Sequence, residues 1–248
     1  MPTVLIIAEK PSLARNIVAG IGKMDKKDGY YINDTYIVSW AFGHLFSLAD
    51  VESYSNNPQS GGWTLDNLPC FPKEFKFELK RGEDKTVDAG VEKQFKILSV
   101  LCNRDDVDTI VNAGDADREG EIIVRLCISN ALKSKKEQKR LWLPDQTPET
   151  VRSALSDMKS ESEYDNLASE GFARTYIDWL YGVNLTRYAT IRTGKLLRVG
   201  RVIVPIVRAI YERDMEIKSF KPDVYYVIRS NEKTNGETVE LISKQKFT

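Results

Sequence analysis

The eight residues 114–121 constrain the fold of this chain more than any other part of its sequence. They follow a β-branched, strand-like run at 107–113 and precede a helix-like run at 122–132. The end of a strand at the start of a helix is where doubly wound α/β proteins bind ligands. The segment carries carboxylates at alternating positions, among them Asp115, Asp117 and Glu119.

Carboxylates at this density repel one another unless a cation lies between them. Hard oxygen ligands suit Mg²⁺, or Mn²⁺, better than zinc. The alternative is that the acids cap the N–H groups of a helix start and meet the positive end of its dipole. A calcium EF-hand is excluded because its twelfth position, counted from Asp115, is Leu126 instead of a glutamate. The segment is therefore either a metal site or a set of capping and solvated acids.

A second polar pair follows the first predicted strand. The continuous apolar run 4–8 is typical of a strand buried on both faces. Helical spacing begins after it, with Pro11 at a position that suits a first helical turn. Glu9 and Lys10 therefore also lie at the carboxyl end of a strand. If the two strands are neighbours, the pair faces the acidic segment; taken alone, such a pair is usually just solvated.

Together these two segments resemble the halves of a Toprim domain, the metal-dependent module of topoisomerases and primases. With the motifs that follow, the chain is similar to the N-terminal part of a type IA DNA topoisomerase of the bacterial topoisomerase III kind. The likeness spans residues 2 to about 230 and rests on the order and spacing of its motifs. These motifs lie at 8–12, 39–45, 115–121, 140–143, 146–149, 178–187 and 200–202.

The resemblance implies a fold, a set of domains and a reaction. The fold is α/β, with a doubly wound, mostly parallel sheet followed by a helical region and the first strands of a β-rich region. The reaction needs no ATP: a tyrosine cuts one DNA strand through a 5′-phosphotyrosine link, another strand passes, and the 3′-hydroxyl reseals the gap. The implied domains are a Toprim domain at 1–150, part of a helical DNA-binding domain at 151–216, and the start of an arch domain at 217–248.

The resemblance also assigns roles to single residues. Glu9 exchanges a proton with the 3′-oxygen, and Lys10 orients the scissile phosphate. Arg118 either neutralises the acids or contacts DNA. The implied ligands of Mg²⁺ (or Mn²⁺) are Asp115, Asp117, Glu119 and Glu9.

The nucleophile of the family lies in a Tyr-Pro-Arg-Thr context, and none of the eleven tyrosines here is followed by proline. The nearest substitute, Tyr188, falls in a predicted helix. We therefore expect a truncated chain that holds the metal and phosphate half of the active site. On this reading the tyrosine belongs to the remaining domains of the parent enzyme, and the chain alone does not cleave DNA.

The distribution of charge favours a nucleic-acid partner although the formal net charge is zero. Residues 187–211 contain no acid but several arginines, so a basic stripe can neutralise phosphates locally; the alternative is a solvated helix face. The only histidine lies in a glycine-histidine element similar to one near the family's active site, although a lone histidine is more often structural. After Gly200-Arg201-Val202, Ile203 and Val204 replace polar residues of the family. The predicted contacts to single-stranded DNA are His44, Arg187, Arg192, Lys195, Arg198 and Arg201.

Composition bounds the class of protein. The content of 42% hydrophobic and 29% charged residues is that of a globular protein, and no apolar run is long enough to span a bilayer. The three cysteines show no C-x-x-C spacing, which argues against a zinc ribbon and for reduced thiols. We expect a cytoplasmic, nucleoid-associated protein without a membrane partner.

The hydrophobic pattern predicts further elements. They are a hairpin of strands 30–32 and 36–40, a surface loop 53–72, a helix 87–102, a strand 139–143, a helix opening at Thr147, a long helix 166–188, and strands 224–228 and 238–242.

Two other classes of function remain open. A Mg²⁺-dependent nuclease or primase-like protein would share Glu9 and the two aspartates and would need no tyrosine. A DNA-binding module would use the same carboxylates only for structure. An aspartate-nucleophile phosphatase is disfavoured because its Asp-x-Asp follows the first strand, where this chain has Glu9-Lys10.

Overall fold

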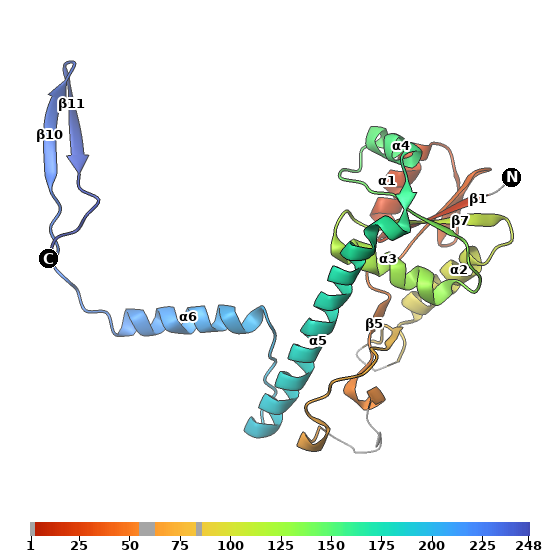
Figure 1. Cartoon of the computed structure of the whole chain (residues 1–248), viewed down its shortest axis with the longest axis horizontal. Helices are drawn as coiled ribbons and strands as arrows, with labels where there is room; N and C mark the ends of the chain where they lie inside the picture. Colours follow the sequence, from red (N-terminus) through yellow and green to blue (C-terminus); the bar gives the residue numbers. More distant parts are fainter. Residues whose placement is uncertain (1–2, 55–62, 83–85) are drawn as a thin grey trace. The chain divides into compact units, whose positions relative to one another are not determined.

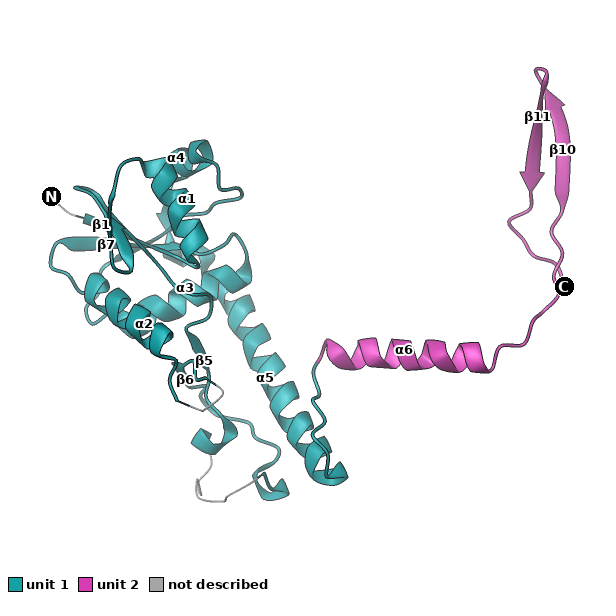
Figure 2. Ribbon diagram, turned by 180° about the vertical axis from the view of Figure 1, so that it is seen from behind, with its two compact units in different colours: residues 1–200 teal, residues 201–248 magenta. Residues whose placement is uncertain are grey.

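The computed structural model describes residues 3–54, 63–82 and 86–248 of the chain. The chain forms two compact units, residues 1–200 and 201–248, drawn in different colours in Figure 2. The first unit holds the predicted site, and each unit is described by itself.

The first unit is built on a mixed sheet with the strand order β2-β3-β4-β1-β7-β8-β9 (Figure 1). The four central strands, β4 to β8 in this order, run parallel, and the outer strands pair antiparallel. This arrangement confirms the predicted α/β, mostly parallel sheet. Within the described residues its strands are β1 (Thr3–Ala8), β2 (Asp25–Lys27), β3 (Tyr30–Ile32), β4 (Tyr36–Trp40), β7 (Val107–Ala113), β8 (Glu137–Arg140) and β9 (Lys159–Ser160).

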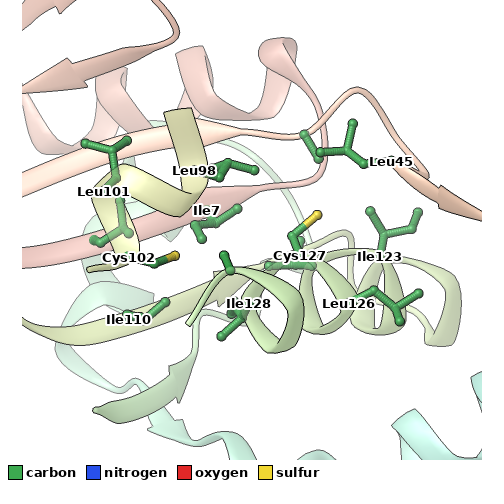
Figure 3. Close-up of a cluster of buried hydrophobic side chains, with 14 of the residues drawn as sticks. Ile7, Leu45, Leu98, Leu101, Cys102, Ile110, Ile123, Leu126, Cys127 and Ile128 are labelled. Atoms are coloured by element: carbon green, nitrogen blue, oxygen red, sulfur yellow. The ribbon is translucent and has the colours of Figure 1, made fainter. Parts of the chain in front are cut away.

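Helices cover both faces of this sheet, and side chains of β1 alternate between them. Leu5 and Ile7 belong to the core on the side of α2 and α3, part of which Figure 3 shows in close-up. Ile6 and Ala8 belong to the core on the side of α1 and α4. The apolar run of β1 is thus buried on both faces, as predicted. The helices that cover the two faces are α1 (Pro11–Ile21), α2 (Ala89–Cys102), α3 (Arg118–Ala131) and α4 (Pro148–Ser156).

Local chemistry explains where several elements begin and end. The predicted hairpin of β3 and β4 is confirmed, and its turn is fixed by the Asn33 side chain, which accepts from the N–H groups of Thr35 and Tyr36. Helix α2 begins two residues later than predicted because the Asp88 carboxylate caps its first turn. The strand predicted at 139–143 is shifted: β8 ends at Arg140, and the apolar residues after it are buried outside the sheet.

A small hairpin and two short 3-10 helices lie between β4 and α2. The hairpin pairs β5 (Phe46–Leu48) with β6 (Phe77–Leu79). The short helices η1 (Val51–Tyr54) and η2 (Leu65–Asn67) occupy part of the predicted surface loop. Residues 55–62 of that loop lie outside the described residues.

A third short helix, η3 (Glu161–Tyr164), leads into the long helix α5 (Asp165–Thr193). The long helix was predicted at 166–188; it extends to Thr193 and ends at Gly194, which has a left-handed φ of 67°. It packs on α3, the helix that follows the acidic segment. Within the described ranges, no helix is both long and apolar enough to cross a membrane.

The second unit contains α6 (Ile203–Lys218) and a hairpin of β10 (Arg229–Thr234) and β11 (Glu237–Ile242). The strand predicted at 238–242 is confirmed. The strand predicted at 224–228 is wrong: of this run only Tyr226 forms a bridge, with Phe247. The turn Asn235-Gly236, with both φ angles positive, sets the hairpin register, and this turn signal outweighs the apolar run.

Candidate metal and phosphate site

The two polar segments meet at one edge of the sheet. Strands β1 and β7 are parallel neighbours with Ala8 opposite Ala113, so Glu9 and Lys10 lie beside the acidic segment. The loop after β4 joins the same edge, since the N–H of Gly43 donates to the carbonyl oxygen of Glu9. The two strands are therefore neighbours, which was the condition for the two polar segments to face each other.

Asp115 is the point of contact between the segments. The Lys10 ammonium donates to Asp115 Oδ2 over 2.5 Å, and the Asp115 N–H donates to Glu9 Oε2 over 3.2 Å. The other carboxylate oxygen, Oδ1, is buried and has no hydrogen-bond partner among the described residues. An unpartnered buried oxygen of this kind calls for a donor or a cation.

This environment perturbs the protonation of Glu9 and Lys10. Burial raises the pKa of Glu9, and the charges of Asp115 and Asp117 add to the increase; the Asp115 N–H and Lys10 oppose it. The hydrogen bond to Asp115 raises the pKa of Lys10. Glu9 therefore takes up a proton more readily than an ordinary glutamate, while Lys10 stays charged.

The acidic turn is held tightly by its two glycines. A Cβ atom on Gly114 would lie 2.0 Å from the carbonyl oxygen of Gly120, and one on Gly120 would lie 2.4 Å from the Asp115 nitrogen. Asp117 caps α3 by accepting from the N–H of Gly120 over 2.8 Å. The capping interpretation therefore accounts for one of the three acids.

Glu119 is bound by groups from other elements. Arg174 of α5 lies 3.0 Å from Glu119 Oε1, and His44 Nε2 lies 3.7 Å from Oε2. Arg118 turns away and forms an ion pair with Glu170 of α5. Sequence reasoning missed Arg174, although its position four residues before Asp178, with which it pairs, was a helical signal.

Two family descriptions match the sequence: Toprim domain over residues 4–144 and DNA topoisomerase over residues 162–248. The Staphylococcus aureus (strain bovine RF122 / ET3-1) protein named putative DNA topoisomerase 3 is 37% identical over 98% of this chain and 32% of its own length. The DNA topoisomerase 3 of strain MRSA252 is 37% identical and that of strain USA300 36% identical, each over the same shares. This chain belongs to the type IA DNA topoisomerase family. It spans about a third of the length of these curated relatives.

The described acids of this chain do not converge on one point. In the described part of the chain, no group of three or more His, Cys, Asp or Glu side chains is placed to hold a metal ion. Mg²⁺ in proteins is commonly bound through one or two carboxylates, with water and substrate phosphate completing its shell. Carboxylate oxygens and the unpartnered Asp115 Oδ1 therefore fit such an ion.

The predicted DNA contacts lie in different settings. Arg187 is buried, forms two 2.9 Å hydrogen bonds with Glu52, and lies 5.0 Å over the Trp63 ring. It ties α5 to the segment around η1. His44 reaches the edge of the site through Glu119. Arg201 lies in the second unit.

The three remaining basic residues cluster at the far end of α5. Arg192 lies in the last turn of the helix, and Lys195 and Arg198 follow it; all three are exposed. Arg192 is eighteen residues after Arg174, which corresponds to roughly 27 Å along a helix axis. The structure thus gives α5 a site-facing end and an exposed basic end.

Proposed function

We propose that this chain supplies the metal- and phosphate-binding half of a type IA topoisomerase active site. The complete enzyme would cut, pass and reseal single DNA strands without ATP through a 5′-phosphotyrosine intermediate. The observation that carries the proposal is the cluster of Glu9, Lys10 and Asp115 at the adjoining ends of β1 and β7.

Asp115 and Asp117, with Glu9 and Glu119 beside them, would hold the ion, Mg²⁺ or Mn²⁺. When bound, the ion offsets negative charge on the scissile phosphate. Lys10 would place its ammonium against the same phosphate and fix its orientation. Arg118 would serve at the edge of the site, where its pairing with Glu170 keeps it near α5.

Glu9 would act as the proton carrier. Its raised pKa suits a carboxyl group that gives a proton to the departing 3′-oxygen and takes it back when that oxygen attacks again. No tyrosine of this chain has the family's Tyr-Pro context. The nucleophile would come from further domains of the parent enzyme.

Single-stranded DNA would run from the acidic edge along α5. Phosphates would contact His44 at the site and the exposed cations at the far end of the helix. Arg201, in the second unit, is proposed separately as a DNA contact. Basic side chains of this kind position a backbone without reading its sequence. The protein would act in the cytoplasm, at the nucleoid.

Covalent trapping tests this proposal. The purified chain is mixed with labelled single-stranded oligonucleotide and Mg²⁺, denatured with SDS and run on a gel. We expect neither an adduct nor a cleaved product. A protein-linked label would place the nucleophile in this chain, with Tyr188 the first to replace. Cleavage without an adduct would favour the Mg²⁺-dependent nuclease or primase-like class instead.

A second candidate function is a DNA-binding module with structural carboxylates. It is favoured by the intramolecular partners of the acids, since Asp117 caps α3 and Glu119 pairs with Arg174. Two results together would support it: equal affinity for single-stranded DNA with and without Mg²⁺, and an affinity that does not change when Asp115→Asn and Asp117→Asn are combined. Binding that Mg²⁺ strengthens only in the unsubstituted chain would exclude it.

A further inference from the structure

A buried cluster of charged residues lies directly behind the acidic turn. Glu121 of α3 and Arg140 of β8 are fully buried, and Glu161 of η3 is 6% exposed. Burying a charge is costly unless it is paired and hydrogen-bonded. The bonding of each carboxylate oxygen therefore decides the charge that the cluster carries.

Glu121 is fully paired. Its Oε1 accepts from Arg125 Nε over 2.6 Å, and its Oε2 accepts from Arg140 Nε over 2.6 Å. Each of its oxygens thus meets a guanidinium group. Glu121 is accordingly the anionic member of the cluster.

Glu161 is paired on one side only. Its Oε1 accepts from Asn112 Nδ2 over 3.0 Å and lies 2.9 Å from the Arg125 nitrogen that already serves Glu121. Its Oε2 is buried and has no hydrogen-bond partner in the described residues. A proton on Glu161 would turn an unsatisfied acceptor into a donor, and the Glu121 carboxylate, with which its side chain is hydrogen-bonded, would be the acceptor.

The charges around Glu161 agree with this assignment. Burial raises the pKa of Glu161 to about 7, Glu121 adds to the increase, and Asn112 and Arg125 oppose it. Asp165 of α5 forms an ion pair with Arg125 and offsets part of the positive charge of the Arg125 guanidinium. Near neutral pH the group therefore changes between its two protonation states.

Arg140 connects the cluster to the acidic turn. While its Nε binds Glu121, Nη1 donates to the carbonyl oxygen of Gly114 over 3.0 Å and Nη2 to that of Asp115 over 2.8 Å. The same guanidinium also packs 4.9 Å from the Trp142 ring. Whatever shifts Glu121 or Arg140 consequently shifts the backbone that carries the Asp115 carboxylate.

We propose that Glu161 is a positioning residue whose protonated carboxyl group donates a hydrogen bond to Glu121 and thereby keeps Arg140 bound to the carbonyl groups of the acidic turn. When Glu161 ionises, a second buried anion competes for Arg125 and Arg140, and the turn loosens. This inference rests on the proposed function in one respect, namely that Asp115 takes part in binding the divalent ion.

The sign of the effect follows from proton linkage. A carboxyl group whose pKa is higher in the folded chain than in the unfolded chain binds an extra proton in the folded state. Stability is then greatest below pH 4.5, the ordinary value for glutamate, and falls as the pH rises towards 7. Divalent-ion affinity should weaken over the upper part of the same range.

Glu161→Gln tests the proposal because its amide N–H₂ supplies a hydrogen-bond donor at every pH. Glu163→Gln is the matched control, since it makes the same change at an exposed glutamate of the same short helix, η3. Thermal unfolding is measured from pH 5 to pH 8, and Mn²⁺ affinity at pH 6 and pH 8. Dividing the Mn²⁺ affinity of the wild type by that of a variant removes the pH dependence that the two proteins share.

We expect Glu161→Gln to unfold at a less pH-dependent temperature than the wild type and to be the more stable of the two at pH 8. The wild-type to Glu161→Gln affinity ratio should fall at least threefold from pH 6 to pH 8, and the wild-type to Glu163→Gln ratio should stay constant. The proposal would be overturned if the wild-type to Glu161→Gln affinity ratio stayed constant, or if the two proteins showed the same pH dependence of the unfolding temperature. If no protein binds Mn²⁺, the metal site of the proposed function fails, and the unfolding comparison alone decides the proton assignment.

Discussion

Lys10 and Asp115 are 105 residues apart in the sequence and form an ion pair of 2.5 Å between Nζ and Oδ2. The pair exists because β1 and β7 are parallel neighbours that end at the same edge of the sheet. It places a cation, a carboxylate and the proton-accepting Glu9 in one small volume. Handling a phosphate and a divalent ion requires this combination of groups.

Arg187→Ala should lower the stability of the first unit by about 1–3 kcal/mol, because it removes two charged hydrogen bonds to Glu52 and contact with Trp63. Urea unfolding measures this change. The effect of Arg187→Ala on DNA affinity should be small. A variant of normal stability with weakened DNA binding would instead make Arg187 a DNA contact.

Combined replacement of Arg192, Lys195 and Arg198 by alanine should act in the opposite way. These side chains are exposed, so stability should change little. Each lost phosphate contact reduces the slope of log affinity against log salt by about 0.7 for single strands, so the slope should fall by roughly 2. Fluorescence anisotropy with an oligonucleotide at several salt concentrations gives the slope, and an unchanged slope would remove these residues from the DNA path.

Two glycines of α5 should respond differently to alanine. A Cβ on Gly171 would lie 2.7 Å from the Arg118 carbonyl oxygen, so Gly171→Ala should force α5 away from α3 and destabilise by about 1–3 kcal/mol. Gly182 has its nearest neighbour at 3.7 Å, so Gly182→Ala should stabilise the helix by about 0.5–1 kcal/mol. Thermal unfolding compares them; equal effects would contradict the close packing of α5 on α3.

The three thiols should differ in reactivity towards iodoacetamide at pH 8. Cys102 and Cys127 are fully buried, and burial raises the pKa of each to about 12. Cys70 is partly exposed and has a less strongly raised pKa. Mass spectrometry of the native protein should find the label on Cys70 first. Early labelling of Cys102 or Cys127 would mean that the core on the α2 and α3 side opens.

Much of the first unit could be predicted from the sequence because its signals are local. The apolar run of β1, the position of Pro11 and the Asn33 turn each act within a few residues, whereas the adjacency of β1 and β7 was only a condition of the sequence argument. Arg174 and Glu161 could not be found in this way. Their significance comes from contacts of α5 and η3 with the acidic turn and with Glu121, and no local pattern records a contact between distant elements. For the same reason, no local pattern indicated that Arg187 faces Glu52.

The most direct test of the central claim is the Mn²⁺ affinity of the chain measured by isothermal titration calorimetry. Asp115→Asn is compared with the wild type and with Asp108→Asn, which removes an exposed acid from the same strand, β7. We predict at least tenfold weaker binding for Asp115→Asn and unchanged binding for Asp108→Asn. Equal affinity of all three proteins would contradict a divalent-ion site at the carboxyl ends of β1 and β7.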